Sequence, residues 1–433
     1  MRYCQSPLVA FRLPVRNSED LAVNLKTSND HNVYLLGAGF SFTAGLPLMA
    51  SFLNRMRDTL EAFQKEGRQE ECQAIGEVLD YRLQAASAAY WSTLDLENVE
   101  QLFSLADAAQ HPVGKRLPVA IAATLEYCRD RGPDRKVRVQ PYDSETSKRV
   151  RPPNGALDAK WAENIPEIYR LIEAAEKEGF TTSHVAALLG MVNGKSEVTG
   201  TNTVITFNYD TLFEDAVTRL GVPWTYGFPF RATSGFFKDV HFEQDDGDDW
   251  GRSDDRNAIP ILKLHGSVNW SVENVDGPHK QLKIFHSYGM LRDKIKEPRI
   301  IPPTWSKGVD DQLSLPWETA VNRLKTATRV VVIGFSMPET DLHFRYLLAA
   351  GLQQNAWLRT IVFVNPDAAG VEARARAVLR GSYIDQGLIR FVPLSSDRFA
   401  AALLGQGRTD APEVSVDVGR YPEGQLGFWT PKA

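Results

Sequence analysis

An apolar run that opens into a glycine turn, Val33–Pro47 with the sequence VYLLGAGFSFTAGLP, constrains this chain more than any other segment. Its first residues predict a buried strand, and the residues after the turn predict a helix. Gly37 and Gly39 leave room for a phosphate to approach the backbone, and the hydroxyls of Ser41 and Thr43 can donate to it. This order of elements predicts the phosphate-binding start of a doubly wound α/β fold.

The turn departs from the common dinucleotide fingerprint. Phe42 stands where that fingerprint has its third glycine, and no obvious acidic residue follows about 20 residues further on. Taken alone, the segment is therefore also compatible with a tight turn that binds no ligand.

Two downstream segments repeat the pattern of a buried strand that ends in polar residues. Thr203–Val217 predicts a strand whose carboxyl end carries Asn208 and Asp210, and Ile261–Trp270 predicts one that ends at His265. Ligands of doubly wound proteins bind just beyond the carboxyl ends of parallel strands. We therefore expect these polar side chains to converge on one crevice.

These motifs resemble those of the sirtuin family. GAGFSFTAGLP is similar to the sirtuin signature GAG-x-S-x-x-AG-x-P, Phe-Asn-Tyr-Asp stands where sirtuins carry Gln-Asn-Ile-Asp, and Leu-His-Gly is shared. Val331–Asp341 and Val362–Asp367 resemble the sirtuin segments that contact the adenosine side of NAD. The resemblance covers about residues 32–63 and 203–392. It implies a Rossmann-like parallel sheet of sirtuin type with an inserted helical module.

The resemblance also implies which residues bind and cleave NAD. Asn208 is an expected catalytic residue that can hold a ribose hydroxyl or position the attacking water. His265 is the other, and it can accept a proton from a ribose hydroxyl or from water. Asp210 is expected to orient the loop, to contact the ribosyl or nicotinamide end, or to stabilise a cation. The remaining expected NAD-binding residues are Gly37, Ala38, Gly39, Ser41, Thr43, Gly334, Ser336 and Asn365.

Two departures from deacetylating sirtuins indicate a different reaction. The three cysteines, Cys4, Cys72 and Cys128, form no CxxC pair and cannot supply the four cysteines of the sirtuin zinc module, so we expect a site without metal. The chain also continues with Leu48-Met49-Ala50 where those sirtuins have Asp-Phe-Arg. The resemblance then implies the branch that hydrolyses NAD to nicotinamide and ADP-ribose, many members of which are effectors of bacterial anti-phage defence.

The residue types suit this hydrolysis, because nicotinamide leaves as a neutral molecule and its departure needs no strong general acid. Two other functions stay open: transfer of ADP-ribose or an acyl group, and sensing of NAD or ADP-ribose without catalysis. The missing zinc module and Asp-Phe-Arg segment disfavour the first. The presence of both Asn208 and His265 disfavours the second.

The expected organisation has four parts. They are the start of the NAD-binding domain at residues 1–50, the inserted helical module at 51–200, the rest of the domain at 201–405, and a tail at 406–433. The module is expected to contain a basic, proline-rich loop near residues 129–157, which is solvated surface or a contact to a partner or to nucleic acid. The acidic run at 242–256 does not fit a calcium loop and is expected to be surface.

The composition excludes several other classes of protein. A net charge of −5 over 433 residues argues against a surface that binds nucleic acid. The chain has no apolar stretch of about 18 residues and no signal-peptide core, so we expect it in the cytoplasm and away from membranes. We expect no separate sensor domain in this sequence, so control is expected from homo-oligomerisation or a separate protein. The resemblance suggests a co-encoded HerA-type ATPase or Argonaute-like protein.

Overall fold

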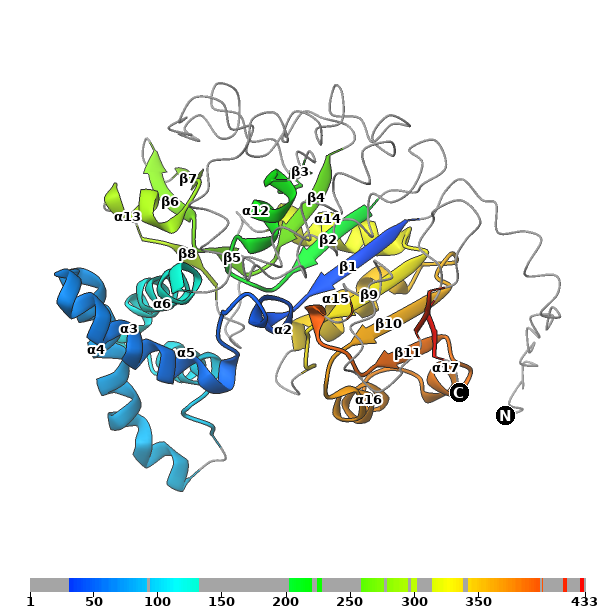
Figure 1. Cartoon of the computed structure of the whole chain (residues 1–433), viewed down its shortest axis with the longest axis horizontal. Coiled ribbons are helices and arrows are strands. Elements are labelled where there is room, and N and C mark those ends of the chain that lie inside the picture. Colours follow the sequence, from blue (N-terminus) through cyan, green and yellow to red (C-terminus); the bar gives the residue numbers. More distant parts are fainter. Residues whose placement is uncertain are drawn as a thin grey trace, which may run out of the picture.

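The computed structural model has a parallel sheet of seven strands at its centre (Figure 1). The structure describes residues 31–91, 94–131, 202–219, 224–227, 258–275, 279–294, 297–301, 314–337, 342–397, 399, 416–418 and 429–431. The sheet order is β11-β10-β9-β1-β2-β4-β3. Its strands are β1 (Asn32–Leu36), β2 (Asn202–Thr206), β3 (Trp224–Thr225), β4 (Ile259–Lys263), β9 (Arg329–Ile333), β10 (Thr360–Val364) and β11 (Ile389–Val392).

All strand pairs of this sheet are parallel, and the order reverses at β1. The chain runs from β1 to β2 on one side and later returns to β9 on the other side of β1. This topology confirms the predicted doubly wound α/β fold. It also places the switch point, where such folds bind ligands, at the glycine turn that follows β1.

The register makes the central strands end at the same level. Every residue of β1, β2, β4, β9 and β10 is buried, as is typical of parallel strands covered on both faces. The last residues of these strands pair with one another across the sheet: Leu36, Thr206, Lys263, Ile333 and Val364. The loops that carry the expected site residues therefore leave the sheet along one edge.

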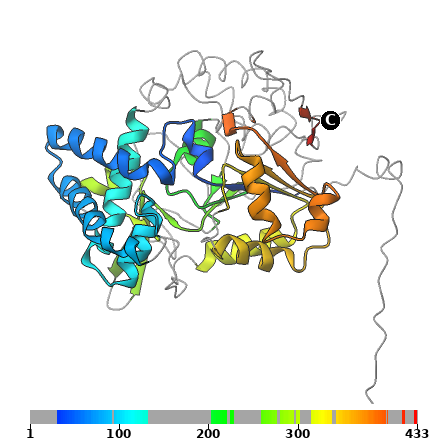
Figure 2. The same cartoon turned by 90° about the horizontal axis from the view of Figure 1, so that it is seen from below.

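Helices cover the sheet and bury its apolar side chains. They are α12 (Leu212–Arg219), α14 (Ser314–Lys325), α15 (Leu342–Leu352), α16 (Ala368–Arg376) and α17 (Gly381–Asp385). Figure 2 shows α14 and α15, in yellow, side by side against the sheet. Leu324 of α14 and Leu348 of α15 belong to the same buried cluster as Leu35 of β1 and Val332 of β9. This core holds the strands whose ends form the candidate site.

A bundle of helices lies between β1 and β2 along the chain. It contains α2 (Ala38–Phe42), α3 (Phe52–Glu66), α4 (Gln69–Gln84), α5 (Val99–Ala108) and α6 (Leu117–Arg131), with short 3-10 turns η1 (Met49–Ser51), η2 (Ala85–Tyr90) and η3 (Pro112–Lys115). α3 has an apolar stripe, which is buried at Leu53, Met56 and Phe63. The helix ends at Gly67, whose φ of 74° closes it in the left-handed region.

Short strands connect this helical module to the sheet. β5 (Gly266–Ser267) pairs with β8 (Arg299–Ile300), and β6 (Trp270–Val275) pairs with β7 (His279–Ile284), ahead of α13 (Tyr288–Asp293). Tyr209, Val268 and Tyr288 share one buried cluster with the module helices. The module therefore packs against the loop after β2 and not only against itself. A further pair, β12 (Val416–Val418) with β13 (Trp429–Pro431), is antiparallel.

Some of the sequence-based expectations fall at or beyond the limits of the described residues. The expectation of a loop from Arg129 is wrong at its start, because α6 continues to Arg131 and Arg129 is buried against α12. The rest of that loop, the acidic run at 242–256 and most of the tail lie outside the described residues. Within the described part, no helix is long and apolar enough to cross a membrane.

The buried His31, just before β1, should make the free energy of unfolding depend on pH. Its ring nitrogens lie 3.0 Å from Thr203 Oγ1 and 3.0 Å from Thr326 Oγ1. Burial, aided by the charge of Arg323, lowers the pKa of His31 from 6.5 to about 4. Between these two pH values the unfolded chain binds a proton that the folded chain does not, so the free energy of unfolding falls as the pH falls.

We expect wild type to lose about 3 kcal/mol more than His31→Gln between pH 7 and pH 4, since Gln cannot titrate. Urea denaturation of both proteins at the two pH values measures this difference. Equal losses would contradict the account of a buried, neutral His31.

Candidate functional site

Asn208 links the loop after β2 to the glycine turn after β1. Its main-chain N–H donates to Thr206 Oγ1 at 3.0 Å, which fixes the start of the loop. Its side-chain Nδ2 donates to the Gly37 carbonyl at 3.0 Å and to Ser41 Oγ at 3.2 Å. A carbonyl only accepts, so this contact fixes which end of the amide is nitrogen. Asn208 Oδ1 has no hydrogen-bond partner among the described residues and can accept one from a hydroxyl or water.

Ser41 and Asp210 extend this contact into a chain of hydrogen bonds. Ser41 Oγ donates to Asp210 Oδ2 at 2.9 Å while it accepts from Asn208. The other carboxylate oxygen of Asp210 accepts the N–H of Leu212 at 3.0 Å, in the turn that enters α12. Ser41 and Asp210 are both buried. Three of the expected site residues therefore form one ordered network.

The glycines of the turn after β1 pack against the loop after β9. The N–H of Gly39 donates to the Gly334 carbonyl at 2.8 Å, and the N–H of Gly37 donates to the Ile333 carbonyl at 3.0 Å. A Cβ at Gly37 would lie 2.7 Å from Phe335 Cα, and a Cβ at Gly39 would lie 2.8 Å from the Gly334 oxygen. On that side the space expected for a phosphate is filled by backbone. The glycines here allow two strand-end loops to touch.

The remaining expected NAD-binding residues lie along the same edge of the sheet. Asn365 Nδ2 donates to the Phe335 carbonyl at 3.3 Å, which holds the loop after β9. Ser336 in that loop is exposed, and its carbonyl accepts from Arg374 Nε at 2.7 Å. Thr43 Oγ1 lies 3.3 Å from Ser396 Oγ, beyond β11. Ala38 is half-buried at the start of α2, which has only five residues.

His265 lies in the turn after β4 and is 2% exposed. The rings of Phe207 and Tyr209, which flank Asn208 in the sequence, lie 5.1 Å and 6.3 Å from its ring, centroid to centroid. Its carbonyl accepts the N–H of Ile301 at 2.9 Å, which ties this turn to the end of β8. The structure thus brings the second expected catalytic residue beside the loop that carries the first.

His343 is a neighbour to which the sequence assigned no chemistry. Its ring centroid lies 6.3 Å from that of His265 and 5.9 Å from that of Trp317. Trp317 Nε1 in turn donates to the Leu264 carbonyl at 3.1 Å. The sequence gives no signal for the contact between His343 and His265. It forms only because the fold places the start of α15 beside the turn after β4.

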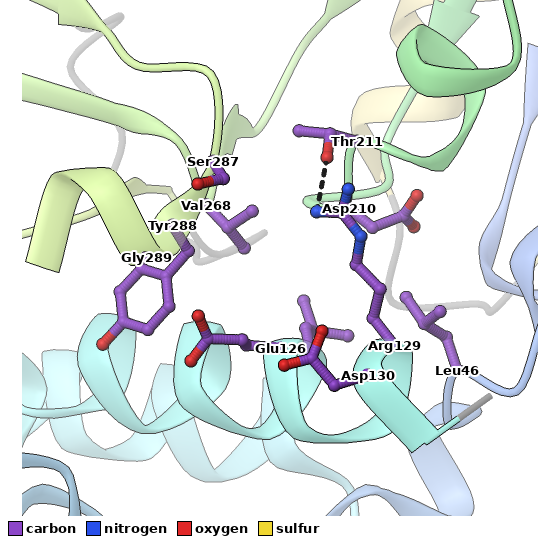
Figure 3. A pocket seen from close by; sticks show the side chains of 11 residues that line it. Leu46, Glu126, Arg129, Asp130, Asp210, Thr211, Val268, Ser287, Tyr288 and Gly289 are labelled. Carbon is purple, nitrogen blue, oxygen red and sulfur yellow. Dashed lines mark hydrogen bonds between the residues drawn. The ribbon is translucent and has the colours of Figure 1, made fainter. Parts of the chain in front are cut away.

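A cavity of about 140 Å³ adjoins Asp210 (Figure 3). It is lined by Leu46, Leu125, Glu126, Arg129, Asp130, Asp210, Thr211, Val268, Ser287, Tyr288 and Gly289. Arg129 of α6 donates to Thr211 Oγ1 at 2.9 Å and forms an ion pair with Asp215 of α12. The inserted module therefore reaches the residue that follows Asp210, a contribution that the sequence analysis did not foresee.

Three carboxylates and one guanidinium belong to the lining of this cavity. Burial raises the pKa of Glu126, and the guanidiniums of Arg68 and Arg292, whose nitrogens lie 2.6 Å and 3.2 Å from Glu126 Oε2, oppose that rise. Asp130 and Asp210 are the other acids of the lining. Among the described residues, no group of three or more histidine, cysteine or acidic side chains could hold a metal ion.

Residues 202–385, from β2 to α17, match the family model described as a SIR2-like domain. No curated protein matches the chain. Solved structures that resemble it include Sir2Tm bound to a propionylated peptide, with 13% identity, 90% of this chain and 99% of the other covered, and a TM-score of 0.33. A Sir2 homologue–NAD complex has 13% identity, 90% and 93% coverage, and a TM-score of 0.35. The doubly wound fold of the chain is shown by the order of its own strands.

Substitution of Gly334 tests the contact between the glycine turn after β1 and the loop after β9. The φ of Gly334 is +66°, and an added Cβ would lie 2.1 Å from the Phe40 nitrogen. Gly387 has a similar φ of +71° with no atom near its Cβ position, so it is a matched control. We expect Gly387→Ala to lower the free energy of unfolding by about 1 kcal/mol and Gly334→Ala by about 3 kcal/mol or more, measured by urea denaturation. Equal losses would contradict the loop contact.

Proposed function

We propose that this chain is an NAD glycohydrolase that cleaves the nicotinamide–ribose bond with water and releases nicotinamide and ADP-ribose. The observation that carries the proposal is the ordered network of Asn208, Ser41 and Asp210 at the switch point of the sheet. The SIR2-like match over residues 202–385 and the motif resemblance support NAD as the substrate.

In the proposed reaction, the bond between the nicotinamide nitrogen and the ribose anomeric carbon breaks, and its electron pair leaves with neutral nicotinamide. Asn208 Oδ1, held in direction by the Nδ2 contact with Gly37, accepts from the attacking water or a ribose hydroxyl. Asp210 stabilises the cation that develops on the sugar. Water then bonds to the anomeric carbon, and its surplus proton passes to His265.

A protein that destroys NAD must be restrained in its own cell. We assign it the role of an NAD-depleting effector of anti-phage defence, controlled by homo-oligomerisation or by a co-encoded partner such as a HerA-type ATPase or an Argonaute-like protein. The bonds from Arg129 to Thr211 and Asp215 support such control. Through them, a partner that moves α6 also moves the loop of Asp210.

The first test is nicotinamide release from NAD. We expect Asn208→Ala and His265→Ala each to lower the release rate by at least about 100-fold, as losses of a positioning group and a general base do. Asn322→Ala, on an exposed part of α14, is the matched control and should leave the rate unchanged. The assays are run with and without co-encoded proteins.

Two results would replace this proposal. Absence of release under every condition, with NAD still bound, would favour a sensor of NAD or ADP-ribose. Consumption of an acyl-lysine peptide or labelling of a protein with ADP-ribose would favour a transferase.

A further inference from the structure

A buried ion pair lies beneath the loop that carries Asn208. Lys263, the last residue of β4, is fully buried, and its Nζ lies 3.0 Å from Glu214 Oε1 on α12. Glu214 is 1% exposed and also accepts from the Tyr226 hydroxyl at 3.2 Å. Asn269 Nδ2 donates to the same hydroxyl at 3.4 Å. The ammonium is therefore held in a polar network that water does not reach.

Stability does not explain this ion pair. Removing two charges from water is expensive, and a buried pair is often no more stable than apolar residues of the same volume. Burial raises the pKa of Glu214, and the neighbouring Lys263 opposes the rise. A charged residue in the strand ILKL needs another reason to be there.

The second contact of Lys263 supplies that reason. Its Nζ donates to the main-chain carbonyl of Asp210. The side chain of Asp210 is already bonded to Ser41 and to the N–H of Leu212, so Lys263 fixes the same residue through its backbone. Lys263 also lies two residues before His265 on the same strand end.

We propose that Lys263 is a positioning residue of the candidate site. Its ammonium fixes the Asp210 carbonyl, and this contact holds the network of Asn208, Ser41 and Asp210 in place relative to His265. The catalytic consequence rests on the proposed hydrolase function, whereas the structural consequence does not.

The test variant is Lys263→Met combined with Glu214→Leu, because Lys263→Met alone would leave a buried carboxylate without its cation. We expect a denaturation midpoint near that of wild type, a loss of about 100-fold in kcat for nicotinamide release, and a change in KM of less than about threefold. Amide hydrogen exchange over residues 207–213 should rise about tenfold, as local opening becomes easier.

Two further variants separate positioning from packing. Glu214→Gln keeps an acceptor for Lys263 and the bond to Asp210, but it leaves the buried ammonium without a counterion, so the denaturation midpoint should fall. Under conditions where this variant is folded, exchange over residues 207–213 and kcat should stay within about fivefold of wild type. Lys263→Gln combined with Glu214→Gln keeps the site polar. The glutamine side chain at position 263 is one bond shorter than that of lysine, so it does not reach the Asp210 carbonyl. This variant should show the same fall in kcat and the same rise in amide exchange as Lys263→Met combined with Glu214→Leu. It takes the place of that apolar variant if the apolar variant does not fold.

Wild-type exchange and kcat in the folded double variants would overturn the proposal. A loss of activity that only follows a loss of stability, with no local rise in exchange, would also overturn it. Absence of nicotinamide release from wild type would instead refute the proposed function. In that case amide exchange over residues 207–213 alone tests the positioning role of Lys263. A rise in the folded double variants relative to wild type supports that role, and no change overturns it.

Discussion

The hydrogen bond from Asn208 Nδ2 to the Gly37 carbonyl is the interaction on which the candidate site depends. It joins the ends of β1 and β2, and it leaves the amide oxygen without a hydrogen-bond partner among the described residues. The same amide nitrogen also orders Ser41 and Asp210, since Ser41 Oγ accepts a second hydrogen bond from it and donates to Asp210. The parallel register makes this possible, because β1 and β2 end side by side.

The strands and their polar ends were predictable because their signals are local. Val33–Leu36 and Arg329–Ile333 are runs of residues that suit a sheet buried on both faces. The contacts around them depend on tertiary structure. Gly37 and Gly39 contact a neighbouring loop and not an open space, because β9 lies beside β1.

The sequence analysis missed charged side chains that become buried in the fold, among them Lys263 and Arg129. Lys263 is the one charged residue of the buried strand β4, and a buried charge must find a partner, which was a usable signal. Its partner Glu214 was hidden in an ordinary first helical turn. Arg129 looked like the start of a basic loop, and only the packing of α6 against α12 shows it to be a buried link. Both residues connect the Asp210 loop to its surroundings, one from the sheet and one from the inserted module.

In the proposed reaction, water and no other acceptor receives the ribosyl group. The most direct measurement is mass spectrometry of the product after NAD is cleaved in water labelled with heavy oxygen. The account predicts nicotinamide together with linear ADP-ribose that carries the label on its anomeric carbon. Nicotinamide accompanied by unlabelled cyclic product, or by ADP-ribose attached to another acceptor, would contradict it.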